Sequence, residues 1–180
     1  MNSVALRGTP EQLNQAKRLM TIATLESIRL VHVRAGHLTA VSGCPVKAIA
    51  EKELPTATAC LIDGTNRFRV LFGHAMHGRR GAEGATEIQV DASFELVYSF
   101  PQDAEPIPSQ AEMQAFADTN ALMNCWPYWR ELVGMLVSRM NLPPLLVPLL
   151  RWVPPPPKPK PVAAESKLEV ENASEVAKNE

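Results

Sequence analysis

The 180-residue sequence lacks the short motifs that mark common active sites. It contains no GxSxG, HExxH, Walker or GxGxxG pattern, so no nucleophile, zinc protease centre or nucleotide loop is indicated. His74 and His77 lie three residues apart and so on opposite sides of a predicted strand, and no second ligand pair has zinc spacing. We predict a protein that is not an enzyme and that holds neither a metal ion nor a cofactor.

Cysteine and long apolar runs are also scarce. Cys44, Cys60 and Cys125 form an odd set without CxxC spacing, which indicates neither a disulfide framework nor a thiol redox motif. The N-terminal residues contain no continuous apolar segment typical of a secretory signal. The apolar run from Leu142 to Leu150 is interrupted by prolines, whereas a membrane helix needs about 20 residues. These absences predict a cytoplasmic protein with no membrane segment.

The net charge is low, with 18 Lys and Arg residues against 19 Asp and Glu residues, so no basic field argues for nucleic acid. The charges are unevenly placed. Residues 27–80 carry eight basic and three acidic side chains, whereas residues 81–153 carry nine acidic and three basic ones. One cluster could contact phosphates and bases: Arg67, Arg69, Arg79, Arg80, Phe68 and Phe72. A solvated hairpin edge explains this cluster more simply, and we favour that interpretation.

Hydrophobic periodicity predicts an α+β fold, with a helix at residues 10–23 that begins after Thr9. Four strands are predicted, at residues 27–38, 56–62, 67–76 and 86–100. Asp63-Gly64 predicts a hairpin turn, and the alternation in the last strand predicts one buried face and one largely wet face. Residues 39–55 are expected to form a crossover connection, with helical character only at 46–53.

A long helix is predicted to follow the strands. Ser109, with Glu112 three residues later, is a capping-box signature for its start, and Asn141 marks its end. Pro127 is predicted to kink or divide the helix. We expect three parts of the chain: an N-terminal helical extension (1–23), one α+β domain (24–153), and a proline-rich spacer with a disordered polar tail (154–180).

The sequence around this helix carries a recognisable order of residues. Trp126-Pro-Tyr-Trp-Arg-Glu131 is followed by the basic Arg139, then by Leu142-Pro143 and Val147-Pro148. This order resembles the SecB export-chaperone family, in which an aromatic-Pro-Tyr-Ala-Arg-Glu element precedes a basic residue, a hydrophobic-Pro pair and a Leu-x-Pro segment. The order of predicted elements also agrees with that family from about Thr24 to Leu150.

The resemblance implies a four-stranded antiparallel sheet packed with a long kinked helix, assembled as a dimer of dimers. It implies a chaperone that holds unfolded polypeptides without ATP, either preproteins for export through the SecA motor or a dedicated client such as an antitoxin. The alternative is a structural or regulatory interaction subunit that has this fold but no general chaperone activity.

The resemblance also suggests roles for individual residues. The peptide-binding candidates are aromatic and apolar: Trp126, Tyr128, Trp129, Leu145, Leu146, Val147, Phe72 and Met76. The candidates for docking a partner protein are the acidic residues Asp91 and Glu95. The candidates for an oligomer interface are Ile28, Leu30 and Val31 of the first strand.

Two departures from the family pattern affect these expectations. Leu149 to Val153 lead directly into Pro154 where the family continues with a second helix, so a truncated helix and an altered or more open peptide groove are expected. The first strand carries basic residues where exporting members present an acidic sheet face, which argues against SecA docking: Arg29, His32, Arg34 and His37.

Overall fold

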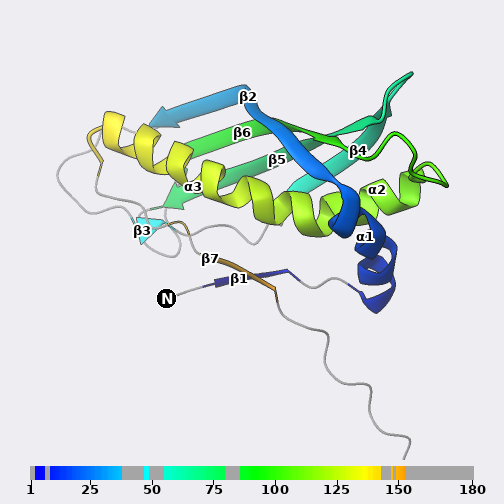
Figure 1. Ribbon diagram of the computed structural model, residues 1–180. Coiled ribbons are helices and arrows are strands. Elements are labelled where there is room, and N and C mark those ends of the chain that lie inside the picture. Colours follow the sequence, from blue (N-terminus) through cyan, green and yellow to red (C-terminus); the bar gives the residue numbers. More distant parts are fainter. Residues whose placement is uncertain are drawn as a thin grey trace, which may run out of the picture.

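A four-stranded antiparallel sheet forms the frame of the molecule. The computed structural model describes residues 3–6, 9–37, 47–48, 55–79, 86–142, 147 and 149–152. The long strands lie in the order β2 (Thr24–His37), β6 (Thr86–Ser99), β5 (Arg67–Arg79) and β4 (Thr56–Ile62), as Figure 1 shows. The two-residue strand β3 (Lys47–Ala48) pairs with the far end of β5. Residues 47 and 48 are therefore extended, although helical character was predicted for 46–53. The predicted antiparallel sheet is confirmed.

The hairpin between β4 and β5 follows from its turn residues. Gly64 has φ 70°, a left-handed conformation that glycine adopts without steric cost. The carbonyl of Ile62 accepts hydrogen bonds from the backbone and the hydroxyl of Thr65, at 3.2 and 2.7 Å. The strands then pair from Ile62 opposite Arg67 to Thr56 opposite Gly73. The turn predicted at Asp63-Gly64 is therefore confirmed.

One continuous helical segment crosses the sheet, composed of α2 (Gln110–Phe116), a π-helical turn η1 (Ala117–Ala121) and α3 (Leu122–Arg139). Its start is the predicted capping box, in which the Ser109 side chain accepts from the Glu112 backbone and the Glu112 carboxylate accepts from the Ser109 backbone. Its end is also as predicted. Asn141 has φ 56°, and Asn141 and Leu142 donate to the carbonyls of Ser138 and Val137.

Pro127 does not divide this helix. α3 continues through Pro127, and the irregular turn is η1, which ends six residues earlier. Proline in a helix interior removes one backbone hydrogen-bond donor and crowds the preceding turn, and both effects destabilise an isolated helix. Here Cys125, Trp126 and Trp129 around it are all buried, so packing holds both sides of the proline in one helix.

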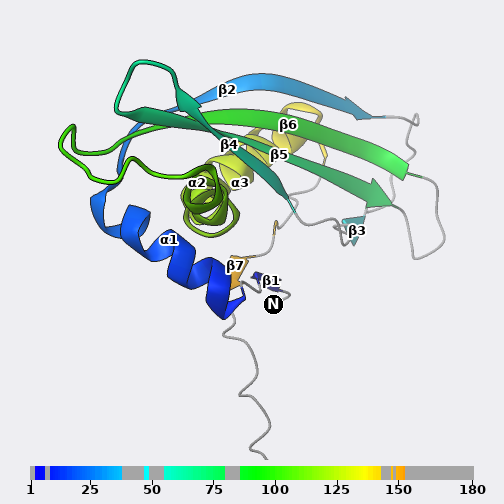
Figure 2. The ribbon, with the colours of Figure 1, turned by 90° about the vertical axis from the view of Figure 1, so that its right-hand side faces the viewer.

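A third layer lies beyond the helix, on the side away from the sheet (Figure 2). The predicted N-terminal helix, α1 (Pro10–Ile22), begins with a capping box between Thr9 and Gln12 and buries Ala16 and Leu19 in the common core. Strand β1 (Ser3–Leu6) runs parallel to β7 (Leu149–Trp152). The expectation of a truncated helix at 149–153 is therefore wrong for 149–152, which are extended.

The two faces of β6 differ as the alternating sequence predicts, with one exception. Its side chains toward the helix are buried: Ile88, Val90, Ala92, Phe94, Leu96 and Tyr98. On the opposite face Gln89, Asp91, Ser93, Val97 and Ser99 are half-buried, but Glu95 is only 8% exposed. Among the described residues, no helix or strand covers this opposite face (Figure 2). None of the described helices is long and apolar enough to cross a membrane.

Candidate functional site

An aromatic cluster joins α3 to the middle of β5. Trp126 and Trp129 lie three residues apart on α3 and both turn inward, while His74 projects from β5 toward them. The His74 ring centroid is 5.5 Å from that of Trp126 and 5.0 Å from that of Trp129. Burial among these rings lowers the pKa of His74 to about 4, so the imidazole is neutral near pH 7.

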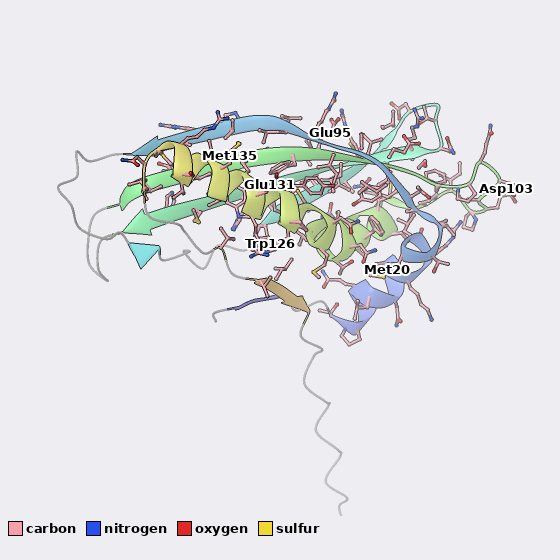
Figure 3. All side chains as sticks on the ribbon, turned by 60° about the vertical axis from the view of Figure 1, so that its left-hand side comes forward. Met20, Glu95, Asp103, Trp126, Glu131 and Met135 are labelled. Atoms are coloured by element: carbon pink, nitrogen blue, oxygen red, sulfur yellow. The ribbon has the colours of Figure 1, made fainter. Side chains whose placement is uncertain are left out.

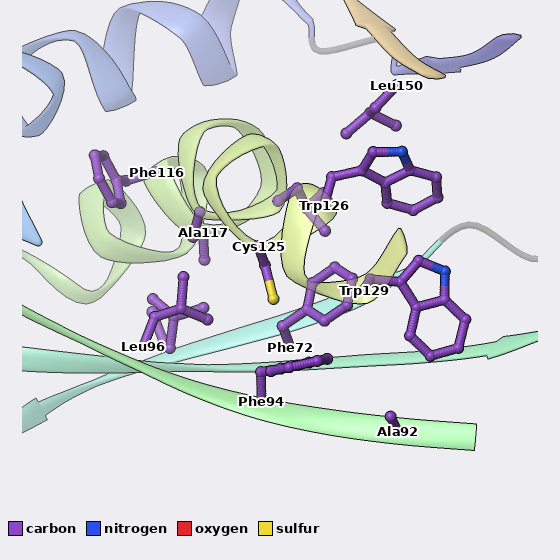
Figure 4. Packing of buried hydrophobic residues seen from close by; sticks show 14 of the residues in the cluster. Phe72, Ala92, Phe94, Leu96, Phe116, Ala117, Cys125, Trp126, Trp129 and Leu150 are labelled. Carbon is purple, nitrogen blue, oxygen red and sulfur yellow. The ribbon is translucent and has the colours of Figure 1, made fainter. Parts of the chain in front are cut away.

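Trp129 contributes a buried polar group to this cluster. Its indole N–H is buried and has no acceptor among the described residues. A buried donor without a partner costs roughly 1–3 kcal/mol. The ring is nevertheless retained in the core, since it packs beside Phe72 and Ala92 of the sheet, as Figure 4 shows.

Most of the predicted peptide-binding residues lie in this core. Phe72, Met76, Trp126 and Trp129 are buried, as is Val147 beyond the helix. Tyr128 alone of the described candidates is exposed. Leu145 and Leu146 lie outside the described residues. Contact of these side chains with a peptide stays a prediction. The buried ones could not touch a peptide directly in this structure and would only support the side chains that do.

Trp126 and Leu150 lie in the core on the side of α3 away from the sheet, and exposed apolar side chains are their near neighbours along the chain: Met123, three residues before Trp126, and Leu149, next to Leu150. We name these four residues the α3–β7 surface. Leu150 lies against Trp126 in Figure 4, and Figure 3 shows Trp126 on the side of α3 that faces β7. Met123 and Leu149 are exposed. The Nε of Arg130 donates to the carbonyl of Val147 at 3.2 Å, which ties the segment before β7 to the helix.

Other exposed apolar side chains lie on the helix side of the edge strand and on α3, and we name them together the β2–α3 flank: Leu30, Val33, Tyr128 and Met135. The register sets Leu30 opposite Phe94 and Val33 opposite Ala92, so both project on the helix side of the sheet. Tyr128 and Met135 are seven residues apart and share one helical face. All four side chains are exposed.

The predicted oligomer residues adjoin this flank. Leu30 and Val31 are exposed and Ile28 is half-buried. Among the described strands, β2 pairs only with β6, which leaves its outer edge without a partner there. A long edge strand with apolar side chains is a usual site of strand pairing between chains.

The acidic docking candidates have intramolecular partners. Glu95 projects to the face opposite the helix, where its carboxylate lies 2.6 Å from Nη2 of Arg29 (Figure 3). The Asp91 carboxylate accepts a hydrogen bond from Gln89 at 2.7 Å. Docking through these two residues therefore stays a prediction, and at Glu95 it would compete with an existing ion pair.

The described side chains do not favour a thiol nucleophile, a metal site or stacking on nucleic-acid bases. Burial raises the pKa of Cys125 to about 12, so its thiol is not a nucleophile near pH 7. Cys60 is half-buried and Cys44 lies outside the described residues. No three His, Cys, Asp or Glu residues in the described ranges are grouped to hold a metal ion. Phe68 and Phe72 are buried, so neither can stack on a base.

Comparison with known proteins identifies the fold. No protein-family model and no curated protein matches the sequence. Among solved structures, the SecB-like chaperone Rv1957 of Mycobacterium tuberculosis, in complex with a ChAD peptide from the HigA1 antitoxin, matches with a TM-score of 0.66. The match has 20% sequence identity and covers 78% of this chain and 99% of that chain. The chain therefore has a divergent SecB-like fold, and the predicted α+β architecture is confirmed.

Adjacent residues of α3 provide a matched test of burial. Trp129 is 0% exposed and Tyr128 is 47% exposed. Trp129→Ala is expected to lower the free energy of unfolding by about 3 kcal/mol or more, because it leaves a large cavity. Tyr128→Ala should cost less than about 1 kcal/mol. Chemical denaturation of both variants measures the difference, and equal losses would contradict this assignment of the two rings.

His74 gives the core a pH dependence. Its pKa of about 4 in the folded chain lies below the ordinary value of 6.5, so between these values the unfolded chain binds the extra proton. Stability should therefore fall as the pH is lowered from 6.5 toward 4, by up to about 3 kcal/mol from this group. Denaturation midpoints measured at several pH values should show a smaller dependence in His74→Phe. Parallel curves for the two proteins would rule out this origin.

Proposed function

We propose that the protein is an ATP-independent, SecB-like cytoplasmic chaperone that holds extended, apolar segments of a dedicated client polypeptide. The observation that carries the proposal is the pairing of β1 with β7 beside Trp126. It means that this part of the molecule already accommodates an extended segment that comes from the far end of the chain. The aromatic and apolar side chains beneath it supply the hydrophobic contact that an unfolded client offers.

The proposed binding mode combines two sources of affinity. Exposed strand backbone takes up an extended peptide through main-chain hydrogen bonds, which are independent of client sequence. Apolar side chains of the α3–β7 surface then bury those of the client, at roughly 25 cal/mol per Å² removed from water. Trp126 supports this surface from beneath, and Met123 and Leu149 lie at its exposed part. Neither source requires a nucleotide.

Two considerations favour a dedicated client over general export. The structural neighbour was solved with a peptide from an antitoxin, so a small partner of that kind is a reasonable client class here. The basic residues Arg29 and Arg34 lie on the sheet face opposite the helix, which no described element covers. Members of the SecB family that deliver preproteins to SecA present acidic residues on their sheet face. We therefore propose an antitoxin-like client and give SecA docking a lower rank.

The function is tested by mixing the purified chain with a reduced, unfolding model protein in the absence of nucleotide. Light scattering should show that aggregation is suppressed at a several-fold molar excess of the chain. Met123→Lys/Leu149→Lys is expected to lose most of this effect, because it places two charges on the proposed contact surface. Absence of suppression by the unaltered chain would overturn the proposal.

A matched control separates the surface from general hydrophobicity. Ile107 is 66% exposed and lies in the loop before α2, whereas Met123 and Leu149 are 40% and 45% exposed. Ile107→Lys should leave suppression unchanged although it removes a more exposed apolar side chain. If it weakens holding as much as the double variant does, the α3–β7 surface is not the client site.

We further propose that the chain associates through β2, as a dimer of dimers. Leu30, Val31 and the half-buried Ile28 support this, because they border an edge strand with no second partner among the described strands. Light scattering should give a mass well above the 19.7 kDa of one chain. Leu30→Lys/Val33→Lys should lower it toward one chain, and Leu71→Lys, equally exposed on the other sheet face, should not. A monomeric unaltered chain would contradict the proposal.

The second candidate function is a structural or regulatory interaction subunit without general chaperone activity. The strand β7 favours this interaction subunit, because the SecB family, which the sequence resembles, has a second helix at this place. The region beside Trp126 therefore differs from the peptide groove of that family. Affinity capture distinguishes the two functions. A single folded partner, together with no suppression of aggregation, would favour the interaction subunit.

A further inference from the structure

Strand β4 is an outer strand of the sheet, and its sequence carries none of the usual protections of such a strand. Among the described strands it pairs only with β5, from Thr56 opposite Gly73 to Ile62 opposite Arg67, with no register shift. Its seven residues, Thr-Ala-Thr-Ala-Cys-Leu-Ile, include no charged residue and no proline. Natural sheets keep outer strands from pairing with other chains through charged side chains, prolines, bulges or a covering element. Protection of β4 must therefore come from another part of the chain.

Two glutamines of α2, which lies beside β4 (Figure 1), occupy the backbone of this edge. The Nε2 of Gln114 donates to the carbonyl of Ala57 at 2.8 Å, and its Oε1 accepts from the backbone N–H of Ala59 at 3.2 Å. One amide group thus supplies the donor and the acceptor that a neighbouring strand would supply. The Nε2 of Gln110 donates to the carbonyl of Ala59 at 2.7 Å. Three backbone groups of β4 that point away from β5 are therefore already bonded to side chains.

An acidic side chain fixes the orientation of the Gln114 amide. The Nε2 of Gln114 also donates to Oδ1 of Asp118 at 2.8 Å, one helical turn further on. Both hydrogens of the amide nitrogen then have acceptors, and the amide oxygen has a donor. Gln114 and Asp118 are both half-buried. Gln114 is therefore a fixed part of the edge and not a freely moving surface side chain.

We propose that Gln110 and Gln114 form an edge guard, which closes β4 to strand addition by another polypeptide. An added strand would have to displace both glutamines, and at Ala57 and Ala59 it would only replace hydrogen bonds that already exist. The guard also limits the size of assemblies. A sheet with one open edge is used up by pairing with one other copy, whereas a sheet with two open edges can add copies without end.

This inference is independent of the proposed client surface and of association through β2. It concerns β4 alone, and β4 and β2 lie at opposite sides of the sheet. The reference in the test is the mass of the unaltered chain, whether that chain is a monomer or an oligomer.

The test removes the guard from the full-length protein with Gln110→Ala/Gln114→Ala. Light scattering over a range of concentrations should give a mass that rises to about twofold or more above that of the unaltered chain, because β4 then offers an additional open edge. Hydrogen exchange is measured at a concentration too low for this association. There the Ala59 amide should exchange about tenfold faster or more, because it has lost its acceptor.

Two further variants separate strand pairing from a general loss of solubility. Gln15→Ala/Gln102→Ala removes two exposed glutamines, on α1 and in the loop before α2, and should keep the mass of the unaltered chain. Thr58→Lys, added to Gln110→Ala/Gln114→Ala, should restore that mass, because a charged side chain on an edge strand opposes pairing. If the loss of both glutamines prevents folding, Gln110→Ala alone replaces the double variant. It frees one of the three backbone groups and should give a smaller rise in mass, which Thr58→Lys again removes.

Three results would overturn the inference. An unchanged exchange rate of the Ala59 amide would show that Gln114 does not protect this edge. Faster exchange without any rise in mass would show that an open β4 does not pair with other chains. A rise in mass that Thr58→Lys fails to reverse would place the new contact outside β4.

Discussion

One-sided burial of the sheet is the constraint on which the rest of the structure depends. The face of the sheet toward the helix holds a stacked pair of rings, Phe68 and Tyr98, with centroids 5.2 Å apart. Phe116 of α2 packs edge-on against both, at 5.5 and 5.0 Å. Close-packed aromatic contacts of this kind fix how the helix crosses the strands. The opposite face receives no such layer among the described residues, so polar and charged side chains occupy it.

Local chemistry made much of this fold predictable. The alternation of residues 86–100, the capping box at Ser109, the Asp63-Gly64 turn and the helix stop at Asn141 each act within a few residues. The parallel pairing of β1 with β7 joins opposite ends of the described chain, and four-residue strands carry little periodicity. The π-helical turn η1 was not predicted either, although three of its five residues, Asp118, Thr119 and Asn120, are weak helix formers.

The site was predictable in composition but not in orientation. Helical spacing puts Trp126 and Trp129 on one side of α3 and Tyr128 on another, yet it does not say which side faces the sheet. The buried state of Glu95 was equally hidden. It depends on Arg29 lying opposite on β2, and a register shift between Leu30 and His32 sets which residues of that strand face which side. Cross-strand partners of this kind follow from register, which a single sequence leaves open.

Phe94 and Glu95 show how one strand meets two different environments. They are neighbours on β6: Phe94 lies in the core beneath the helix, and Glu95 projects to the opposite face, where it pairs with Arg29 at 2.6 Å. A carboxylate that is only 8% exposed loses most of its hydration, and the nearby guanidinium offsets part of that cost. The register that places Leu30 opposite Phe94 also places Arg29 opposite Glu95. A shift of β2 by one residue would therefore remove an apolar contact on one face of the sheet and leave a buried charge without its partner on the other.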